Sequence, residues 1–524
     1  MEPSSAAGVA SGGAAPTAPA SRAAFRRLCE EIEFDAGRGA GGRSRELPDG
    51  AFLGSTQMQP MGNGVEPDPA QAVEWYHDRL LSGDDAARAR GYLRSRGLDG
   101  DQVRQADAPA ADRRHVVVVG DGRVLEMGRR WVAAGAEVTV FTGMPNRPEG
   151  RIHPAYRGRL AVDEEWEGMR VLRSWLYASP RHGFARTLLN NTTFMVSSAV
   201  HALARGGGLD VLVASSPPWF PHLTGTLVHA LRRVPLVLEV RDLWPDYLAG
   251  MGTVKSGAAM RGIFATERAM LRRADHAVVV TESFRARVIE KGTAPDRVDV
   301  VPNGVDTALY YAADEPPPID ALRRADGELI VGYLGNFGAG QDLIRVLDAA
   351  ALLEAADPRI RVVLAGEGTM TEQVQARARE MGLRRTTIHP PILKTQTRAF
   401  YNACDVCLVP LADFPILQET IPSKIFEVMA CERPVVASVA GEAARIVQRS
   451  GGGLVVPPGD ARAIADAVLR LRDTPAEERA AMGAAGRAYV GAHFARETLA
   501  ARYLEILRGV DARRRGGTAV PRPA

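Results

Sequence analysis

The sequence predicts an α/β protein with two doubly wound, Rossmann-like domains that face a cleft. From residue 115 onwards, short valine-rich runs alternate with amphipathic stretches, and this alternation occurs in two successive series. Runs that are apolar throughout are typical of parallel strands covered by helices on both faces. The length of 524 residues also exceeds what one hydrophobic core usually serves, so two domains and an additional segment are expected.

The additional segment is residues 1–112, for which the sequence predicts a low-complexity, partly helical and largely disordered extension. Residues 1–24 and 36–68 are rich in Gly, Pro, Ala and polar side chains, which leaves little to bury. Residues 71–105 have helical spacing and resemble the short helical segment behind the zinc module of bacterial DNA primases. No zinc ligands precede this stretch, so we interpret it as a fused remnant.

The first domain is predicted to span residues 113–307. Its expected strands are short runs rich in valine, a residue that favours the pleated and buried environment of a sheet. These runs are HVVVVG (115–120), EVTVFTG (137–143), MRVLRSW (169–175), DVLVASS (210–216), PLVLEV (235–240), HAVVVT (276–281) and RVDVVPNG (297–304). Amphipathic stretches separate them, as expected for a parallel sheet with covering helices.

The second domain is predicted to span residues 308–492, after a break near residues 303–318. Its expected strands are ELIVGYLGN (328–336), IRVVLAGEG (360–368), TTIHPP (386–391), DVCLVPL (405–411), RPVVAS (433–438) and GGLVVPP (452–458). Helical stretches such as residues 342–356 alternate with them, so a second doubly wound sheet is expected. Residues 493–510 have apolar side chains at helical spacing, and residues 511–524 are predicted to be a disordered tail.

Composition excludes several classes of protein. No run of about 18 or more apolar residues occurs, and the N-terminus lacks a basic start followed by an apolar stretch, so neither a membrane span nor a signal peptide is predicted. We therefore expect a cytoplasmic protein. Cys404 and Cys407 form a C-x-x-C pair, but they flank the start of a predicted buried strand. No second pair or histidine cluster completes a zinc site, so we expect core thiols.

The charge is unevenly distributed along the chain. The net charge is only +3, and basic patches interleaved with aromatic residues are lacking, so no nucleic acid is expected as a partner. Residues 113–307, however, carry 26 Lys and Arg against 19 Asp and Glu, an excess of 7 positive charges. This excess predicts that the first domain meets an anionic partner.

The sharpest chemical signal is a pair of carboxylates, Glu419 and Glu427, eight positions apart, the second in an evident helix start. Backbone N–H groups of Ile421, Ser423 and Lys424 would lie at the N-terminus of that helix, beside the lysine side chain. Such a group of donors suits a diphosphate. The alternative interpretation is an ordinary loop in which Ser423 caps the helix and the charges are solvated.

At this point the chain resembles glycosyltransferase family 4, over about residues 113–510. The motifs that carry the resemblance are EVRDLWPDYL, VVPNGVDT, GYLGNFGAGQDL, VVLAGEG, DVCLVPL, IPSKIFEVMACERPVVAS and GGLVVPPGD, in this order. EVRDLWP with PSKIFE is most similar to the branch that builds bacterial surface polysaccharides, including N-acetylfucosamine-type transferases. The resemblance implies a GT-B fold and transfer of a hexosyl or N-acetylhexosaminyl group, with retention, from a nucleotide-diphosphate sugar. It implies no cofactor and no metal, and it places helix 493–510 back on the first domain.

The resemblance also implies roles for the motif residues of the second domain. Glu427 would accept hydrogen bonds from the donor ribose, Glu419 would hold sugar hydroxyls, and Lys424 would neutralise the departing diphosphate. The further donor-binding positions are Gly335, Asn336, Phe337 and Gly338 in a turn after the first strand, Gly366, Glu367 and Gly368 after the second, and Pro391 and Ile392 beside the base. Relatives have an Arg and a Lys after the first turn, whereas residues 340–342 here contain neither. Lys424 would therefore have to neutralise more of the charge of the diphosphate.

In the first domain the charged run after strand 235–240 is expected to face the cleft, because it follows the carboxyl end of a parallel strand. The candidate acceptor-side residues are Arg241, Trp244, Asp246 and, after the preceding strand, Ser215. A local Arg–Asp pair is the alternative. Ser215 stands where many relatives place a histidine, and a serine cannot replace imidazole as a base at neutral pH. Asp242 is therefore the substitute candidate for activating or orienting the acceptor.

One departure from the family bears on activity. Relatives follow the first strand with a long loop carrying a Gly-Gly, whereas here the strand runs through residues 121–122 almost directly into a helix. A nucleotide-sugar-binding pseudoenzyme with an impaired acceptor site is therefore the alternative function. The expected acceptor is a glycan or a polyprenyl-linked sugar. Arg181, Arg186 and the apolar segment 187–203 further predict peripheral contact with an anionic membrane at the inner face.

Overall fold

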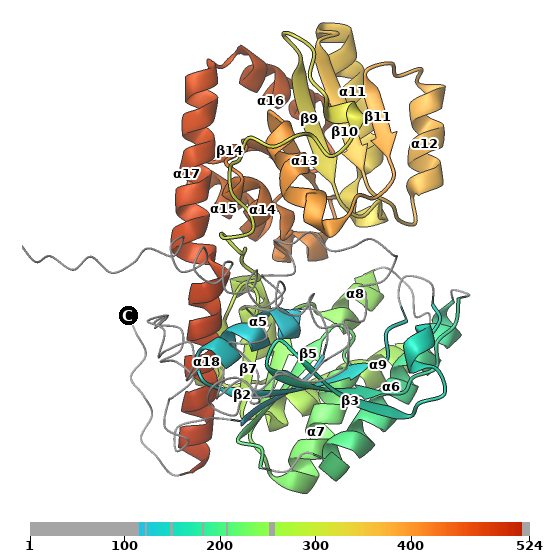
Figure 1. The fold of residues 1–524 in the computed structure, drawn as a ribbon, viewed down its shortest axis with the longest axis vertical. Helices are drawn as coiled ribbons and strands as arrows, with labels where there is room; N and C mark the ends of the chain where they lie inside the picture. Colours follow the sequence, from blue (N-terminus) through green and yellow to red (C-terminus); the bar gives the residue numbers. More distant parts are fainter. Residues whose placement is uncertain are drawn as a thin grey trace, which may run out of the picture. The chain divides into compact units, whose positions relative to one another are not determined.

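The computed structural model describes residues 115–120, 123–146, 150–180, 183–205, 208–250 and 257–515. They form two α/β halves (Figure 1). The predictions for residues 1–112, including the primase-like stretch, lie outside the described residues. Every strand predicted for residues 115–456 is present, which confirms the predicted fold class.

The first half contains an eight-stranded sheet in the order β3-β4-β2-β1-β5-β6-β7-β8. Its strands are β1 (His115–Val119), β2 (Glu137–Gly143), β3 (Ala161–Trp166), β4 (Met169–Ser174), β5 (Val211–Ser216), β6 (Leu236–Val240), β7 (His276–Val279) and β8 (Val298–Val300). All neighbours pair in parallel except β3, which runs antiparallel to β4 at the edge, with Ala161 opposite Ser174. The sequence did not predict β3, because AVDEEW lacks an apolar run.

Helices cover both faces of this sheet. The helices of the first half are α5 (Arg123–Ala133), α6 (Phe184–Arg205), α7 (Phe220–Arg232), α8 (Trp244–Gly250), α9 (Gly257–Arg273) and α10 (Glu282–Glu290). On one face, Met127 and Trp131 of α5 pack with Val116 and Val118 of β1. On the other face, α6, α7, α9 and α10 contribute side chains to a second core cluster.

The second half contains a six-stranded, all-parallel sheet in the order β11-β10-β9-β12-β13-β14. Its strands are β9 (Leu329–Leu334), β10 (Ile360–Ala365), β11 (Thr386–His389), β12 (Val406–Pro410), β13 (Val435–Ser438) and β14 (Gly453–Val456). Its helices are α11 (Leu343–Ala356), α12 (Thr371–Glu380), α13 (Thr397–Ala403), α14 (Lys424–Ala430), α15 (Gly441–Ser450), α16 (Ala461–Asp473) and α17 (Ala476–Phe494). Side chains of α11, α12 and α16 cover one face, and those of α13, α14, α15 and α17 cover the other. Cys404 and Cys407 are buried free thiols, as predicted.

The chain passes twice between the halves, and the two crossings lie side by side. Val305 forms a parallel bridge with Ala495, its N–H donates to the Phe494 carbonyl at 2.8 Å, and its carbonyl accepts from the Arg496 N–H at 2.9 Å. Gly304 is needed here, because its φ is +63° and a Cβ would lie 2.6 Å from the Phe494 carbonyl oxygen.

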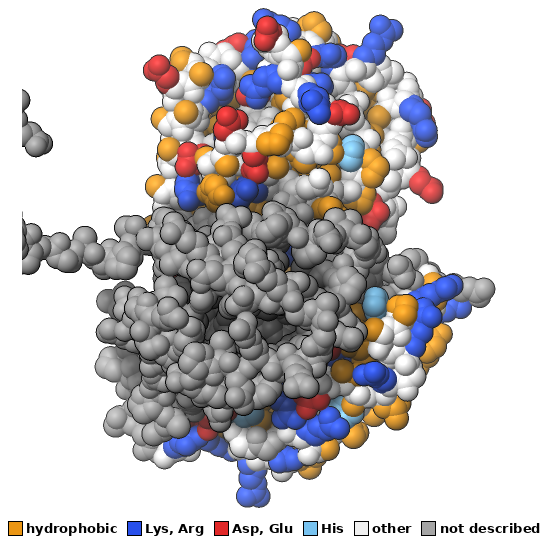
Figure 2. Space-filling model, in the orientation of Figure 1, with side chains coloured by type: hydrophobic (Ala, Val, Ile, Leu, Met, Phe, Trp, Pro, Cys, Tyr) orange, Lys and Arg blue, Asp and Glu red, His pale blue; other side chains and the backbone are white. Residues whose placement is uncertain are grey.

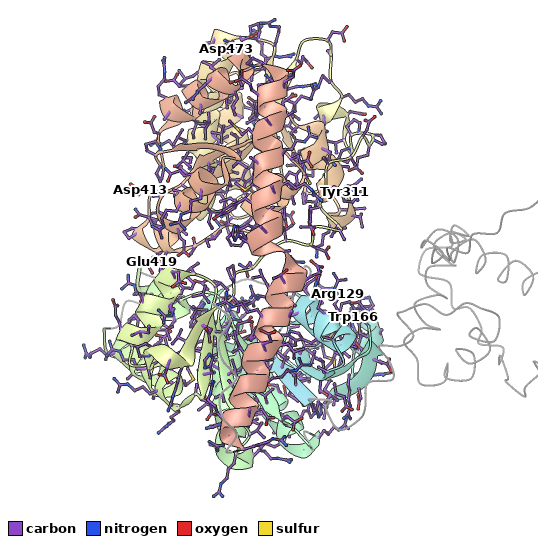
Figure 3. All side chains as sticks on the ribbon, turned by 90° about the vertical axis from the view of Figure 1, so that its left-hand side faces the viewer. Arg129, Trp166, Tyr311, Asp413, Glu419 and Asp473 are labelled. Atoms are coloured by element: carbon purple, nitrogen blue, oxygen red, sulfur yellow. The ribbon has the colours of Figure 1, made fainter. Side chains whose placement is uncertain are left out.

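The last helix, α18 (Arg496–Arg514), continues from α17 and packs on the first sheet (Figure 3). The Trp131 indole donates to the Ala500 carbonyl at 3.0 Å, and the Tyr503 ring meets the Trp131 ring edge-on at 5.2 Å. The predicted segment 493–510 covers the end of α17 and most of α18. The prediction of a disordered tail from residue 511 needs correction, because α18 continues to Arg514. The Asp511 side chain also accepts a hydrogen bond from Arg515. Residues 516–524 lie outside the described part.

Candidate active site

Two glycine turns lie at the carboxyl ends of β9 and β10. Strand β9 stands between β10 and β12, where the strand order reverses, and such switch points open a crevice beyond the strand ends. Gly335 and Gly366 both have a φ of +148°. A Cβ on Gly366 would lie 1.8 Å from the Gly335 carbonyl oxygen, so the two turns touch and neither tolerates a side chain.

Lys424, the first residue of α14, lies directly against the first of these turns. A Cβ on Gly335 would lie 2.8 Å from the Lys424 Nζ, and this nitrogen is 4.0 Å from the centre of the Tyr333 ring. Burial lowers the pKa of Lys424 to about 7, although the charge of Glu427 opposes the shift. The site therefore holds a cation that lacks enough negative charge around it, which suits an anionic ligand.

Glu427 follows one turn later on α14. Its Oε2 accepts a hydrogen bond from the Tyr401 hydroxyl at 3.2 Å, and burial raises the pKa of its carboxyl above the usual range. Nearby, Ser423 occupies the N-cap position, but its side chain makes no capping hydrogen bond. Among the described residues, the backbone N–H groups of Ile421 and Ser423 have no backbone acceptor. The arrangement leaves donors available beside the carboxylate, which favours a ligand loop over a capped helix.

The structure brings most predicted residues of the two turns together. A Cβ on Gly368 would lie 2.4 Å from the Asn336 Oδ1, so these residues are neighbours. Asn336, Glu367 and Gly368 are exposed, and Gly338 is half-buried. Pro391 is exposed, while Ile392 packs with Ile421 against the edge of one core cluster.

Phe337 requires a correction. Its side chain is fully buried in the core beside Tyr333. Its N–H donates to the Glu367 carbonyl, and its carbonyl accepts from the Met370 N–H, both at 2.8 Å. With ring and backbone already engaged, Phe337 supports the turn and offers no group to a donor.

Glu419 lies at the end of the 3-10 helix η9 (Pro415–Glu419) and contacts the first half of the chain (Figure 3). Its Oε1 accepts from the Arg287 guanidinium at 2.7 Å. Close by, Glu442 accepts from the backbone N–H groups of Glu282 at 3.0 Å and Ser283 at 3.2 Å, at the start of α10. In this structure Glu419 is thus paired with Arg287, and it does not point freely at a sugar site.

In the first half, Asp242 and Trp244 follow the carboxyl end of β6. Burial raises the pKa of the Asp242 carboxyl, against the hydrogen bond from the Leu243 backbone N–H. The Trp244 ring packs with those of Trp219 and Phe220, at 6.2 and 6.1 Å between ring centres. The Asp242 carboxyl is therefore more easily protonated than that of an exposed aspartate, and it lies two residues before the aromatic Trp244.

Arg241 turns inward to its own domain. Its Nε donates to the Ser216 carbonyl at 2.9 Å and lies 3.8 Å from the Glu239 carboxylate. Arg241 is thus engaged locally with Glu239, whereas the alternative interpretation of the sequence was a local Arg–Asp pair.

Two of the predicted acceptor-side residues are engaged with other groups of the protein. Ser215 is only 1% exposed, and its hydroxyl donates to Glu239 Oε2 at 2.5 Å. Asp246 accepts from Lys291 at 2.5 Å, and the same ammonium donates to Glu267 at 2.6 Å. Ser215 is thus committed to the protein interior, while the Asp246 carboxylate stays partly exposed and is paired with Lys291.

Sequence reasoning missed a buried ion pair between Arg123 and Glu239. The Arg123 Nε lies 3.0 Å from Glu239 Oε1, and its other nitrogens donate to Asn303 Oδ1 at 2.6 Å and to the Val301 carbonyl at 2.8 Å. The sequence feature that could have indicated this pair is the glutamate inside the otherwise apolar strand LVLEV. Helix α5 begins at Arg123, soon after β1 ends at Val119, as the short connection after β1 predicts.

His222 belongs to α7, which covers the opposite face of the sheet from α5. Its Nε2 is 3.0 Å from the Glu239 carbonyl oxygen. Burial lowers its pKa to about 4, so it is neutral at physiological pH.

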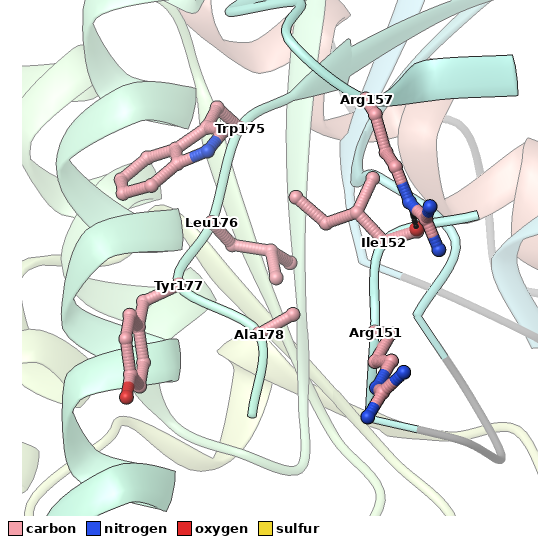
Figure 4. A pocket seen from close by; sticks show the side chains of 7 residues that line it. All are labelled: Arg151, Ile152, Arg157, Trp175, Leu176, Tyr177 and Ala178. Carbon is pink, nitrogen blue, oxygen red and sulfur yellow. Dashed lines mark hydrogen bonds between the residues drawn. The ribbon is translucent and has the colours of Figure 1, made fainter. Parts of the chain in front are cut away.

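A shallow pocket of about 410 Å³ lies apart from these residues, after the carboxyl end of β4. Leu176 and Ile152 point toward one another across it, Arg151 and Arg157 flank it, and Trp175 and Tyr177 point toward the neighbouring helix (Figure 4). Within the described ranges, no group of three or more His, Cys, Asp or Glu side chains could hold a metal ion. Nor does any helix of the described part have the length and apolar character to cross a membrane.

Two family models match the chain. The model described as "Glycosyl transferase 4-like domain" matches residues 121–304, and "Glycosyl transferases group 1" matches residues 318–489. The D-inositol 3-phosphate glycosyltransferase of Kineococcus radiotolerans is 30% identical over 69% of this chain and 83% of its own length. WcaI of Escherichia coli (strain K12), which is assigned to colanic acid biosynthesis as a glycosyl transferase, is 28% identical over 57% of this chain and 75% of its own length.

Solved structures agree on the fold. Sucrose-phosphate synthase from Thermosynechococcus elongatus superposes with a TM-score of 0.60 at 23% identity, covering 76% of this chain and all of the other. Anabaena HepE, solved in complex with UDP and glucose, gives 0.55 at 17% identity, over 75% of this chain and 99% of its own. Both halves, the ordered motifs and these relatives agree, and the chain belongs to family 4 of the GT-B glycosyltransferases, which use nucleotide sugars.

Proposed function

We propose that the protein transfers a hexosyl or N-acetylhexosaminyl group, with retention, from a nucleotide-diphosphate sugar to a glycan or polyprenyl-linked acceptor in cell-surface polysaccharide synthesis. The observation that carries the proposal is the position of Lys424, buried against the Gly335 turn and one helical turn from Glu427. The likeness to WcaI supports the polysaccharide role.

The chemistry assigned to each residue follows from its contacts. The Lys424 ammonium and the N–H groups of Ile421 and Ser423 would hold the diphosphate and stabilise its charge as the glycosidic bond breaks. Glu427, already oriented by Tyr401, would accept from the ribose hydroxyls. These groups supply the positive charge that a metal provides elsewhere, so we propose metal-independent donor binding without a cofactor.

On the acceptor side, Asp242 would orient the incoming hydroxyl. Glu419 would hold sugar hydroxyls once it leaves Arg287. We propose that the reaction takes place in the cytoplasm, at the inner face of the membrane.

The alternative is a nucleotide-sugar-binding pseudoenzyme, which the buried Arg123–Glu239 pair beside the shortened connection after β1 favours. A protein of this kind would keep the donor pocket and lack transfer.

Two measurements on the full chain test the proposal. A thermal-shift screen with UDP, GDP, dTDP and ADP should show a rise in melting temperature with one of them, because a ligand that binds only the folded state stabilises it by mass action. Transfer from the matching sugar nucleotide to lipid-linked glycan extracts should then be measured. Stabilisation without transfer or donor hydrolysis would support the pseudoenzyme, and no stabilisation by any nucleotide would refute donor binding itself.

A further inference from the structure

Helices α6 and α7 expose large aliphatic side chains on their outer surface. Six such residues are between 44% and 62% exposed: Leu188, Leu189, Val196, Val200, Leu227 and Leu231. Isolated exposed leucines are common, but a contiguous apolar surface on a folded domain usually marks an interaction site. The question is therefore whether these side chains share one surface.

Contacts between the two helices show that they do. Thr224 of α7 donates to the Met195 carbonyl of α6 at 3.3 Å, and Arg232 donates to the Leu203 carbonyl, so the helices run side by side in the same direction. Both helices bury their opposite sides in one core cluster over the same face of the first sheet. On α6, residues 189, 196 and 200 recur at helical spacing, and residues 227 and 231 do so on α7. The exposed side chains thus form one outward surface.

The same helix layer is strongly basic. Across α6, α7 and α9 the only carboxylate is Glu267, which is 6% exposed and paired with Lys291. The exposed basic residues on these helices and the cap of α7 are Arg186, Arg205, Arg232, Arg233, Arg261, Arg268, Arg272 and Arg273. Blue and orange side chains gather at the lower right in Figure 2, where α6 and α7 lie in Figure 1.

We propose that this surface of α6, α7 and α9, called here the basic apolar surface, docks on an anionic lipid bilayer. Leucine and valine side chains would enter the interface between headgroups and acyl chains, and the arginines would contact the headgroups. Nucleic acid fits the charge but offers no partner for six exposed aliphatic side chains. A second copy of the chain docked through the same surface would place its eight arginines against these eight, and the like charges would repel.

This inference rests on the proposed function in one respect, because a polyprenyl-linked acceptor would be presented at the same bilayer. The carboxyl edge of the first sheet adjoins the surface. Beyond β4, the Trp175 carbonyl accepts from Ser197 of α6 at 2.5 Å, and the Tyr177 carbonyl accepts from Asn190 at 2.7 Å. Docking through α6 would therefore keep the acceptor side of the sheet close to the lipid. Arg181, which the sequence analysis also predicted to contact the membrane, lies outside the described residues.

Vesicle co-sedimentation of the full chain tests the proposal, with neutral phosphatidylcholine vesicles and vesicles that contain phosphatidylglycerol. We expect the wild type to bind anionic vesicles at least about tenfold more strongly than neutral ones. The triple variant Arg205→Glu, Arg261→Glu, Arg268→Glu should lose about 100-fold, because each arginine near an anionic surface contributes about fivefold. The variant Val200→Ser, Leu227→Ser, Leu231→Ser should also bind less, including at high salt.

A matched control reverses three exposed arginines of the second half, Arg379→Glu, Arg449→Glu and Arg470→Glu, and should bind vesicles like the wild type. Nucleotide-dependent thermal shifts, measured on every variant, confirm folding and separate this inference from the proposed function. Binding of wild type to neither vesicle, equal binding to both, or unchanged binding of the first triple variant would overturn the proposal. A further outcome would also overturn the proposal. In it, the wild type binds duplex DNA but no vesicle, and the variant Val200→Ser, Leu227→Ser, Leu231→Ser binds the DNA equally well.

Discussion

The carboxyl edges of the two sheets carry charge in different ways. At the edge of the second sheet, Lys424 is a half-buried cation with a lowered pKa, and the N–H groups of Ile421 and Ser423 lack backbone acceptors. At the edge of the first sheet, Arg123 and Glu239 are paired with each other and with neighbouring polar groups. The second edge is prepared for an anion from outside, whereas the first has already satisfied its charges from within.

This difference indicates that the halves contribute unequally to ligand recognition. Donor binding requires little rearrangement of the second half, because its polar groups already converge. Of the acceptor-side residues predicted from the sequence, Asp242 and Trp244, with the aromatic rings around Trp244, remain as candidates for the acceptor.

Removing one partner of the buried pair should be the most damaging change. Glu239→Gln leaves the Arg123 guanidinium buried without its countercharge, so we expect a loss of about 3–5 kcal/mol in the free energy of unfolding. Urea unfolding followed by tryptophan fluorescence measures it. The double variant Arg123→Met, Glu239→Leu should regain most of the loss. A Glu239→Gln protein within about 1 kcal/mol of wild type would show that the pair is not the central contact of this edge.

At the other edge, Glu427→Ala should act on binding rather than folding. Its loss leaves ribose hydroxyls without their acceptor, and we expect nucleotide affinity to fall by about 1–3 kcal/mol in calorimetry. Glu380→Ala, at an exposed position of α12, is the control. If affinity is unchanged while Glu427→Ala still folds, the ribose assignment fails.

The lowered pKa of Lys424 predicts a pH dependence of donor binding. The side chain is charged below about pH 7 and loses its proton above it, and only the charged form attracts a diphosphate. Nucleotide affinity should therefore fall as pH rises from 7 to 9, by no more than about tenfold per unit. Calorimetry at pH 8 in buffers of different ionisation enthalpy should also show uptake of nearly one proton on binding.

Lys424→Met provides the comparison for this effect. It should bind nucleotide weakly and lose both the slope and the proton uptake. A wild-type affinity that is level between pH 6 and 9 would contradict the assignment.

The smallest effect concerns the contact between the two halves. Arg287 is partly exposed, and ion pairs of this kind contribute about 0.2–1 kcal/mol. Arg287→Ala should release Glu419 for sugar hydroxyls and tighten binding of the nucleotide sugar by up to about fivefold, while affinity for the nucleotide alone stays the same. Arg285→Ala, on the same helix but bonded to carbonyls of its own domain, should change neither. Equal tightening for both ligands would mean that Glu419 does not touch the sugar.

The sequence predicted elements better than side-chain directions. Unbroken valine runs identify buried parallel strands, and all of them are present, whereas β3 escaped because an edge strand needs no apolar run. The family resemblance assigned both Lys424 and Gly335 to donor binding, although they are distant in the chain. They lie together because β9 and β12 are adjacent strands whose following loops meet. Ser215 was placed correctly at a strand end and Asp246 lies in α8 after the next strand, but the sequence did not show the partners that engage them. Their partners, Glu239 and Lys291, come from other elements, and position along one strand does not show which way a side chain turns.

Helix α18 has a consequence for how the chain is made. It covers one face of the first sheet, where Tyr503 and Leu507 pack with Val116 and Trp131. A ribosome releases all eight strands of that sheet long before it reaches α18, so throughout translation of the second domain the nascent first domain carries an apolar face that α5 covers only in part. Complete folding of the beginning of the protein must wait for its end. Truncated transcripts that end before the codon for residue 496 would yield aggregation-prone proteins that depend on chaperones or are degraded.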